Sequence, residues 1–233
     1  MSEVPPLPIA QPQFDFGKPF SFVFDDPRWP QKIALGGLFY LLSMAIIGIF
    51  FVFGYVARTT RNIISNVPHP MPEWDDLGDM FSEGLRLFGI MIVFALPMLM
   101  LAGAFIVPAI LLDATNHAPV QFGATLFMIL AALILIPLWL ATVCIMPASL
   151  LFAVVERRFG AAFEFRRIFP FIRTNIGNYA LAFVVAIIAR LIGGLGFWLL
   201  CIGVFFTGFW ALLITAHAFA QVYRIAIRPI TVP

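Results

Sequence analysis

The sequence has few charged residues for its length. Charged side chains make up 11% of the 233 residues, whereas apolar side chains make up 62%. A soluble domain is about one quarter charged and close to one half apolar, so a soluble fold could not bury this much apolar surface. The net charge of +2 is small and the basic residues fall in a few separate segments, which argues against a nucleic-acid partner. We therefore expect a chain that lies mostly in a lipid bilayer.

Cysteine, histidine and known catalytic motifs are scarce or missing as well. Cys144 and Cys201 both lie inside apolar runs, which argues against a disulfide framework or a thiolate metal site. His69, His117 and His217 are far apart, and no metal motif such as H-E-x-x-H occurs. A lone membrane histidine can ligate a tetrapyrrole, which stays an alternative for His217, but we expect no cofactor and no metal. Since G-x-S-x-G, Walker and dinucleotide motifs are also missing, we expect no enzymatic activity.

Long apolar runs predict an all-α, polytopic membrane protein. About 20 apolar residues suffice for one helical crossing, and four runs have about that length or more: 87–112, 121–155, 176–192 and 198–223. Short turns join them in pairs, which predicts two transmembrane helical hairpins. The 121–155 run would be about 50 Å long against a hydrocarbon core of about 30 Å, so it must kink, tilt or project. Prolines at four positions offer kinks: Pro97, Pro108, Pro137 and Pro147.

The first part of the chain is predicted to lie at the membrane boundary. Residues 1–32 combine prolines with interleaved aromatic and polar side chains, which is typical of an extended interfacial tail. The remainder, 33–228, is expected to form a single membrane domain. Its first apolar run, 33–57, either crosses the membrane once or re-enters as two short helices that turn near Ser43–Gly48. Basic residues at both ends of this run favour the re-entrant form.

Two amphipathic segments are predicted between the crossings. The 72–86 segment is expected to begin a helix at Pro72 and to lie flat at the interface, with its acidic residues on one face. The arginine-rich 156–175 segment is expected to lie beside it. We expect ion pairs between them to lock the two hairpins and form a platform for a partner; the alternative is that the arginines bind anionic lipid headgroups. The candidate interaction residues are Trp74, Asp76, Asp79, Glu83, Arg166, Arg167 and Arg173.

The last apolar run carries two stripes at helical spacing. Small residues, which let helices approach closely in lipid, recur at Gly203, Thr207, Ala211 and Thr215. Polar residues follow on another face at His217, Gln221, Arg224 and Arg228. The first stripe predicts helix packing, within the chain or with another subunit. The second could receive lipid phosphate, a partner carboxylate or water, and we expect water.

Several segments, mostly in the N-terminal third, carry a resemblance to a known family. They are Phe16–Phe24, Asp26-Pro27-Arg28-Trp29, Gly36-Gly37, Gly54-Tyr55 and Pro72-Glu73-Trp74-Asp75-Asp76. Through them, residues 14–225 resemble the prokaryotic membrane family catalogued as domain of unknown function 4013. The resemblance implies a multi-pass architecture with interfacial helices between hairpins, and it implies no particular activity.

These patterns predict a non-enzymatic accessory or structural subunit of a membrane protein assembly, in contact with the lipid bilayer and with other membrane-protein subunits. The alternative is a small-solute transporter or channel, which would need a polar cavity near the membrane midplane. The basic segments lie on one side of the crossings, which predicts the cytoplasmic (inner) membrane of a prokaryote with the C-terminus in the cytoplasm.

The charge distribution makes the topology testable. Segments 58–86, 156–175 and 224–233 should share the cytoplasmic side, because the intervening turns contain no Lys or Arg. In a background without Cys144 and Cys201, a thiol probe that cannot cross the membrane should label a cysteine at Asn116 in intact cells. Labelling at Ser65 under the same conditions would show that this orientation is wrong.

Overall fold

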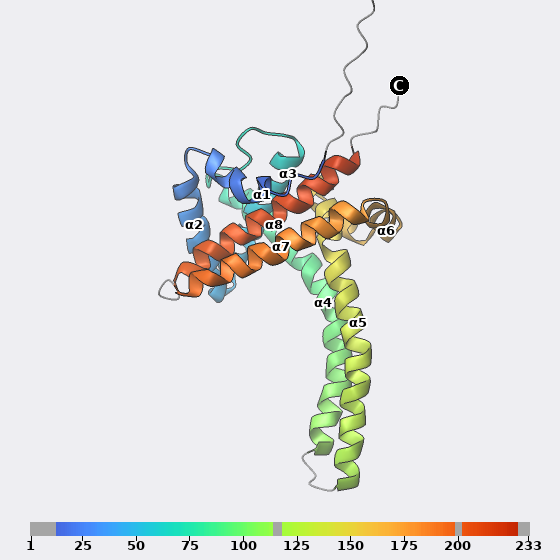
Figure 1. Ribbon diagram of the computed structural model, residues 1–233. Coiled ribbons are helices and arrows are strands. Elements are labelled where there is room, and N and C mark those ends of the chain that lie inside the picture. Colours follow the sequence, from blue (N-terminus) through green and yellow to red (C-terminus); the bar gives the residue numbers. More distant parts are fainter. Residues whose placement is uncertain (1–12, 114–117, 199–201, 228–233) are drawn as a thin grey trace, which may run out of the picture.

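The computed structural model describes residues 13–113, 118–198 and 202–227, and within these ranges every regular element is a helix (Figure 1). Four helices are long and apolar enough to cross a membrane: α4 (Leu77–Asp113), α5 (Ala118–Glu156), α7 (Ile176–Leu195) and α8 (Gly203–Ile227). Helix α4 packs against α5, and α7 packs against α8. The prediction of an all-α membrane fold with two long helical hairpins is confirmed.

Shorter helices surround the ends of these hairpins. They are α1 (Lys18–Ser21), η1 (Phe22–Asp25), α2 (Trp29–Leu42), η2 (Ser43–Ala45), α3 (Ile47–Ile64), η3 (Phe159–Phe163), α6 (Phe165–Thr174) and η4 (Gly196–Trp198), where η marks a 3₁₀ helix. Helices α2 and α3 pack on α8, and α3 also packs on α4. Helices α2, α3, α7 and α8 form what we call the body. The α4–α5 hairpin projects from the body in a different direction from α7 and α8 (Figure 1).

The apolar run at 33–57 is broken into two helices. The chain turns at η2, where Ile46 has a left-handed backbone with a φ of 67°. The far ends of α2 and α3 are held near each other, because Lys32 at the start of α2 donates from Nζ to the carbonyl of Met71, shortly after α3, at 2.7 Å. This is the geometry of the re-entrant alternative. The turn exposes the apolar side chains of Met44 and Ile47, which suits a tip that dips into lipid.

The segment before α2 is not an extended interfacial tail over its described part. Residues 18–25 form α1 and η1, and they dock on α8. Phe22 and Val23 are fully buried there. The expected tail is therefore wrong for this stretch, because the chain is helical and Phe22 packs into the protein core, although Phe24 stays exposed. The first part of the expected tail, residues 1–12, lies outside the described residues.

The α3–α4 crossing depends on two glycines that let the helix backbones touch. A Cβ atom at Gly54 would collide with the backbone of Met80 on α4, and a Cβ atom at Gly84 would collide with the carbonyl group of Phe50 on α3. The contact is therefore reciprocal, one glycine from each helix. Close backbone approach of this kind is the usual way in which helices pack in lipid, where no hydrophobic force drives them together.

The small-residue stripe of α8 lies against α7. The Thr207 hydroxyl donates to the Gly193 carbonyl at 2.6 Å, and a Cβ atom at Gly193 would lie 3.0 Å from the Cβ atom of Ala211. Gly203 sits beside Gly196 at the turn between the helices. The fourth member, Thr215, donates to the carbonyl of Ala211 within its own helix at 2.8 Å. The stripe therefore contributes to packing within the chain.

Substitution of Gly84 tests the α3–α4 contact. Gly84→Ala should lower the free energy of unfolding by about 1–3 kcal/mol, the usual cost of forcing extra atoms into a packed interior. Gly103→Ala, also on α4, is the matched control because nothing lies within 4 Å of its added methyl group. Unfolding of the purified protein in mixed micelles with increasing sodium dodecyl sulfate would compare the two. Equal stability of the two variants would contradict the close contact.

Candidate functional site at the base of the α4–α5 hairpin

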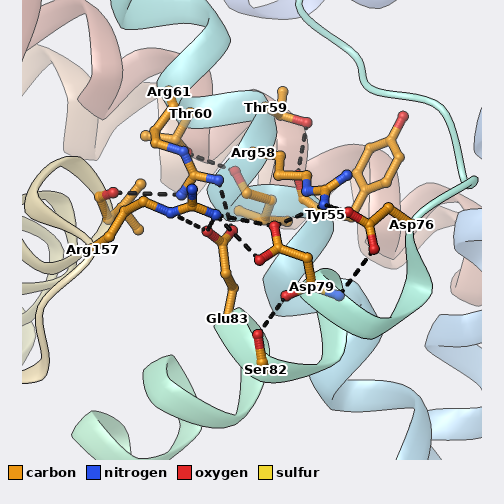
Figure 2. Close-up of polar contacts among 12 residues, drawn as sticks. Tyr55, Arg58, Thr59, Thr60, Arg61, Asp76, Asp79, Ser82, Glu83 and Arg157 are labelled. Carbon is orange, nitrogen blue, oxygen red and sulfur yellow. Dashed lines mark hydrogen bonds and ion pairs between the residues drawn. The ribbon is translucent and has the colours of Figure 1, made fainter.

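Charged side chains from three parts of the chain meet where α4 begins and α5 ends (Figure 2). We call them the base network: Arg58 and Arg61 from α3, Asp76, Asp79 and Glu83 from the start of α4, and Arg157 just after α5. Every member of the network has at least one partner of opposite charge within 4.0 Å. The network therefore joins α3 to both helices of the projecting hairpin.

Glu83 is the most buried member of the network, with a side chain that is 3% exposed. Its carboxylate accepts a hydrogen bond from Arg61 Nη2 at 2.7 Å and another from Arg157 Nε at 2.9 Å. A buried carboxylate is strongly destabilising unless it is paired and hydrogen-bonded. Here two guanidinium groups, one from each side, meet that requirement.

Asp76 and Asp79 form the outer part of the network. Arg58 donates from Nη2 to one oxygen of each carboxylate at 2.7 Å, and Arg157 Nη2 reaches Asp79 at 3.0 Å. The hydrogen bond from Arg58 is the main cause that holds the pKa of Asp76 below its usual range. On the other side, the hydrogen bond to Glu83 is the main cause that raises the pKa of Arg157. Both shifts favour the charged forms, so Asp76 and Arg157 stay ionised at neutral pH.

Local structure explains how these charges come together. The N–H of Asp79 donates to Asp76 Oδ1 at 3.2 Å, which is the hydrogen bond of a helix N-cap. Helix α4 therefore begins at Leu77 and not at Pro72, so the expected start was wrong. Arg157 has a φ of 52°, an uncommon left-handed conformation for a residue other than glycine. The chain turns sharply there, directly after α5, which returns the guanidinium group to Glu83.

The expected interfacial helix at 72–86 is also wrong as a separate element. Residues 77–86 are the first turns of the continuous helix α4, and apolar side chains lie on both the buried and the exposed side of it, since Met80 is fully buried. The apolar side chains of Leu77, Phe81 and Leu85 point outward, while Glu83 is buried. In a bilayer this is the favourable arrangement, because lipid accepts the apolar face and the protein must satisfy the charges.

The acidic residues pair with other arginines than those expected. Arg167 binds Glu156 and Glu164, each at 2.6 Å, and its guanidinium group lies 5.1 Å from the centre of the Phe152 ring. Arg166 and Arg173 are exposed and form no ion pair with the described residues. The predicted pairing with Arg166, Arg167 and Arg173 was therefore wrong, since nearer carboxylates hold Arg167.

Arg158 joins that second cluster by binding both Glu156 and Glu164. Two consecutive residues therefore belong to different clusters: Arg157 binds the acidic residues of α4, and Arg158 binds Glu164 directly before α6. The end of α5 is therefore held by charge pairs on two sides.

A third charged cluster joins the start of α2 to the segment that follows α3. The buried Lys32 binds Asp26 at 2.7 Å and Glu73 at 2.6 Å, in addition to the Met71 carbonyl. Although burial opposes ionisation of Asp26, the hydrogen bonds from Lys32 and from the Arg28 N–H lower its pKa. Three acceptors match the three N–H donors of a lysine. Sequence reasoning missed this cluster because its members are separated by up to 47 positions.

Trp74 lies in the loop before α4 and not on a helix face. Its indole ring stacks on Tyr55 with a centroid distance of 4.2 Å and on Phe39 with a centroid distance of 4.8 Å. Its Nε1 donates to the Lys32 carbonyl at 3.2 Å. Trp74 therefore fastens the loop to α2 and α3, which sets the position from which α4 starts.

The polar stripe of α8 forms hydrogen bonds and packing contacts within the protein. Gln221 is 2% exposed; its Oε1 accepts from the Asp15 N–H at 3.0 Å and its Nε2 donates to the Asp15 carbonyl at 3.1 Å. His217 is buried beside the Phe22 ring, and Arg224 donates to the side chain of Asn66 at 2.9 Å. The expectation that this stripe faces water was therefore wrong for His217 and Gln221, whereas Arg224 is only partly buried and its hydrogen bond to Asn66 is exposed. Arg228 lies outside the described residues.

The described residues contain no group of three His, Cys, Asp or Glu side chains that could hold a metal ion. What the site does contain is a rigid charged junction. One signal in the sequence could have indicated it: Arg58 and Arg61 lie three residues apart on α3, and Asp79 and Glu83 lie four apart on α4, so each pair shares a helix face. Nothing in the local pattern indicates that Arg157 joins them.

The fold and this site define a multi-pass, all-α membrane protein in which a charged base holds a projecting helical hairpin. The family model described as "Protein of unknown function (DUF4013)" matches residues 37–202, and the chain belongs to this family. The matched stretch begins on α2, includes the base network, the α4–α5 hairpin and α7, and ends directly before α8. No curated protein and no solved structure matches the chain.

Removal of the Glu83 charge tests the base network. Breaking a buried ion pair costs roughly 3–5 kcal/mol, but Arg157 is 52% exposed and water will compensate part of the loss. We expect Glu83→Gln to lower the free energy of unfolding by about 2–3 kcal/mol. Asp76→Asn is the control, and it should have a much smaller effect because its side chain is 58% exposed. The same detergent unfolding titration measures both, and an effect of Asp76→Asn as large as that of Glu83→Gln would refute the central role of Glu83.

Proposed function

We propose that the protein is a non-enzymatic accessory or structural subunit of a membrane protein assembly. The part that would contact the assembly is the free arm, which we define as residues 95–113 of α4 and 118–142 of α5. The observation that carries the proposal is the isolation of this arm: it projects beyond all other helices (Figure 1), and its two helices pack on each other.

The length of the free arm suits a membrane crossing. Its α4 part has 19 residues and measures about 28 Å at 1.5 Å per residue, close to the hydrocarbon core of about 30 Å. Large apolar side chains such as Leu99, Met100 and Leu133 are exposed along it. The free arm is thus a two-helix transmembrane unit that stands apart from the body of its own chain.

Prolines give the free arm a second property that favours a protein neighbour. Pro108 and Pro137 have no N–H, so each leaves the carbonyl four residues earlier, at Ala104 and Leu133, without its helical donor. No side chain of the described residues donates to either carbonyl. In membrane helices such groups are commonly satisfied by neighbouring helices. A partner helix with a polar side chain would meet this need.

Inside the body, a neighbouring helix does bond to the backbone beside a proline. Pro147 itself leaves the Val143 carbonyl without its helical donor. One residue further along, the Tyr179 hydroxyl of α7 donates to the Cys144 carbonyl at 2.7 Å and accepts from the Ala148 N–H at 3.2 Å. Among the described residues, the prolines of the free arm have no side-chain hydrogen bond of this kind beside them.

The proposal includes an orientation and a membrane. Since Arg58, Arg61, Arg157, Arg158 and Arg167 gather at the base of the arm, the positive-inside rule favours the cytoplasmic side for the base and for the C-terminus. The sequence resemblance favours the cytoplasmic membrane of a prokaryote. The charge pairs at the base would then hold the free arm in a fixed direction across the bilayer.

Site-specific photo-crosslinking in the native membrane tests this function. A benzoyl-phenylalanine at Leu133, in the free arm, should form one protein adduct of defined mass. The same group at Leu38, which is exposed on α2, should give no such adduct. Glu83→Gln should reduce the yield at Leu133, because the arm loses its fixed direction. Adducts with lipid alone at both positions would contradict the role as a subunit.

A further inference from the structure

A cleft of about 760 Å³ is lined by α3, α5, α7 and α8, with further residues from α2, η2 and α4. Its lining is almost entirely aliphatic and aromatic, and Arg190 of α7 is the one charged residue among the described residues that line it. A site for a small polar solute would carry more polar groups, so the cleft gives no support to transport of such a solute. Its chemistry suits a molecule with a long apolar part and a single anionic group.

Arg190 is without a partner in the part of the chain that the structure describes. It forms no hydrogen bond and no ion pair with those residues, in contrast to Arg61 and Arg157 of the base network. It lies 14 residues after the first residue of α7, about 21 Å along a mostly apolar helix, and it is exposed although it lines the cleft. An arginine inside a membrane span almost always finds a partner. An anion in the cleft would provide it.

The cleft has one polar end and one apolar end. Gly193 of α7 lies against Thr207 of α8, and a Cβ atom at the adjacent Gly208 would lie 2.9 Å from the Tyr40 ring. Tyr40 and Arg190, which both line the cleft, therefore lie at the same level. From there the lining residues of α3 run from Ile49 to Thr60, a distance of about 16 Å at 1.5 Å per residue.

The size of the cleft favours an acyl chain over a helix. An α-helix with its side chains is about 10–12 Å wide. A hydrocarbon chain is narrower and flexible, so it can follow the apolar lining along α3 without separating the helices that line the cleft.

We propose that the cleft holds an acyl chain of an anionic phospholipid whose phosphate group binds Arg190. The guanidinium group supplies a charged fork that matches phosphate oxygens, and the Tyr40 hydroxyl at the same level supplies a further donor. The acyl chain lies along α3 and fills the space between it and α7–α8. The lipid is then a structural component of the body, separate from any partner of the free arm.

Lipid binding to the full-length protein tests the proposal. The probes are 1-palmitoyl-2-oleoyl phosphatidylglycerol and phosphatidylcholine with the same acyl chains, titrated into detergent-solubilised protein and counted by native mass spectrometry. Arg190→Gln should weaken the binding of phosphatidylglycerol at least about fivefold, the size of one arginine–headgroup interaction. Binding of phosphatidylcholine, whose phosphate charge is offset by its own choline cation, should weaken clearly less. Arg173→Gln is the control, because Arg173 is exposed like Arg190 but lies outside the cleft.

A second variant tests the apolar part of the cleft. Ala216 of α8 lines the cleft, and Ala216→Phe should weaken the binding of both lipids while Arg190 remains in place. Circular dichroism and gel filtration show whether the variants stay folded. The proposal is overturned if Arg190→Gln leaves the affinity for phosphatidylglycerol unchanged, or if Arg173→Gln lowers it by the same factor. The latter result would place the anion at the arginines of α6.

Discussion

The arrangement of the whole molecule depends on one buried carboxylate. Glu83 lies on α4 near the start of an otherwise apolar helix, and it is stable there because arginines from α3 and from the end of α5 reach it together. If either arginine were displaced, the body and the projecting hairpin would lose a shared contact and Glu83 would be left with too few donors. The charge pairs therefore specify how the two parts of the protein are oriented, which apolar contacts in lipid specify poorly.

The remaining contacts support this junction. The glycines at the α3–α4 crossing bring the two helices close enough for short charge pairs, and Trp74 fixes the loop that leads into α4. Tyr179 joins α5 to α7 at the Pro147 position. At the other side of the body, Gln221 holds the segment before α1 by two backbone hydrogen bonds of Asp15. The free arm has no comparable hydrogen bonds to the body among the described residues. We therefore propose that the free arm is the part that contacts a partner.

The sequence predicts the helices well and their mutual arrangement less well. Apolar runs and the small-residue stripe depend on local spacing, so the long helices and the close approach at Thr207 follow from the sequence. The Asp76 cap was missed because Pro72 offers an equally plausible helix start. The pairing of Glu83 with Arg157 spans 74 positions and the contact of Asp15 with Gln221 spans 206. Such contacts depend on how the hairpins pack and on the left-handed turn at Arg157, and neither is visible in local periodicity.

A distance measurement by pulsed electron paramagnetic resonance tests the junction most directly. One spin label would replace Ser65 at the end of α3 and a second would replace Leu133 on the free arm, in protein without native cysteines and reconstituted in lipid nanodiscs. We expect a single narrow distance distribution for the otherwise unchanged protein and a broad one after Glu83→Gln, because the arm then changes its direction relative to the body. Equally narrow distributions with the same mean distance in both proteins would contradict the claim that the base network fixes the arm.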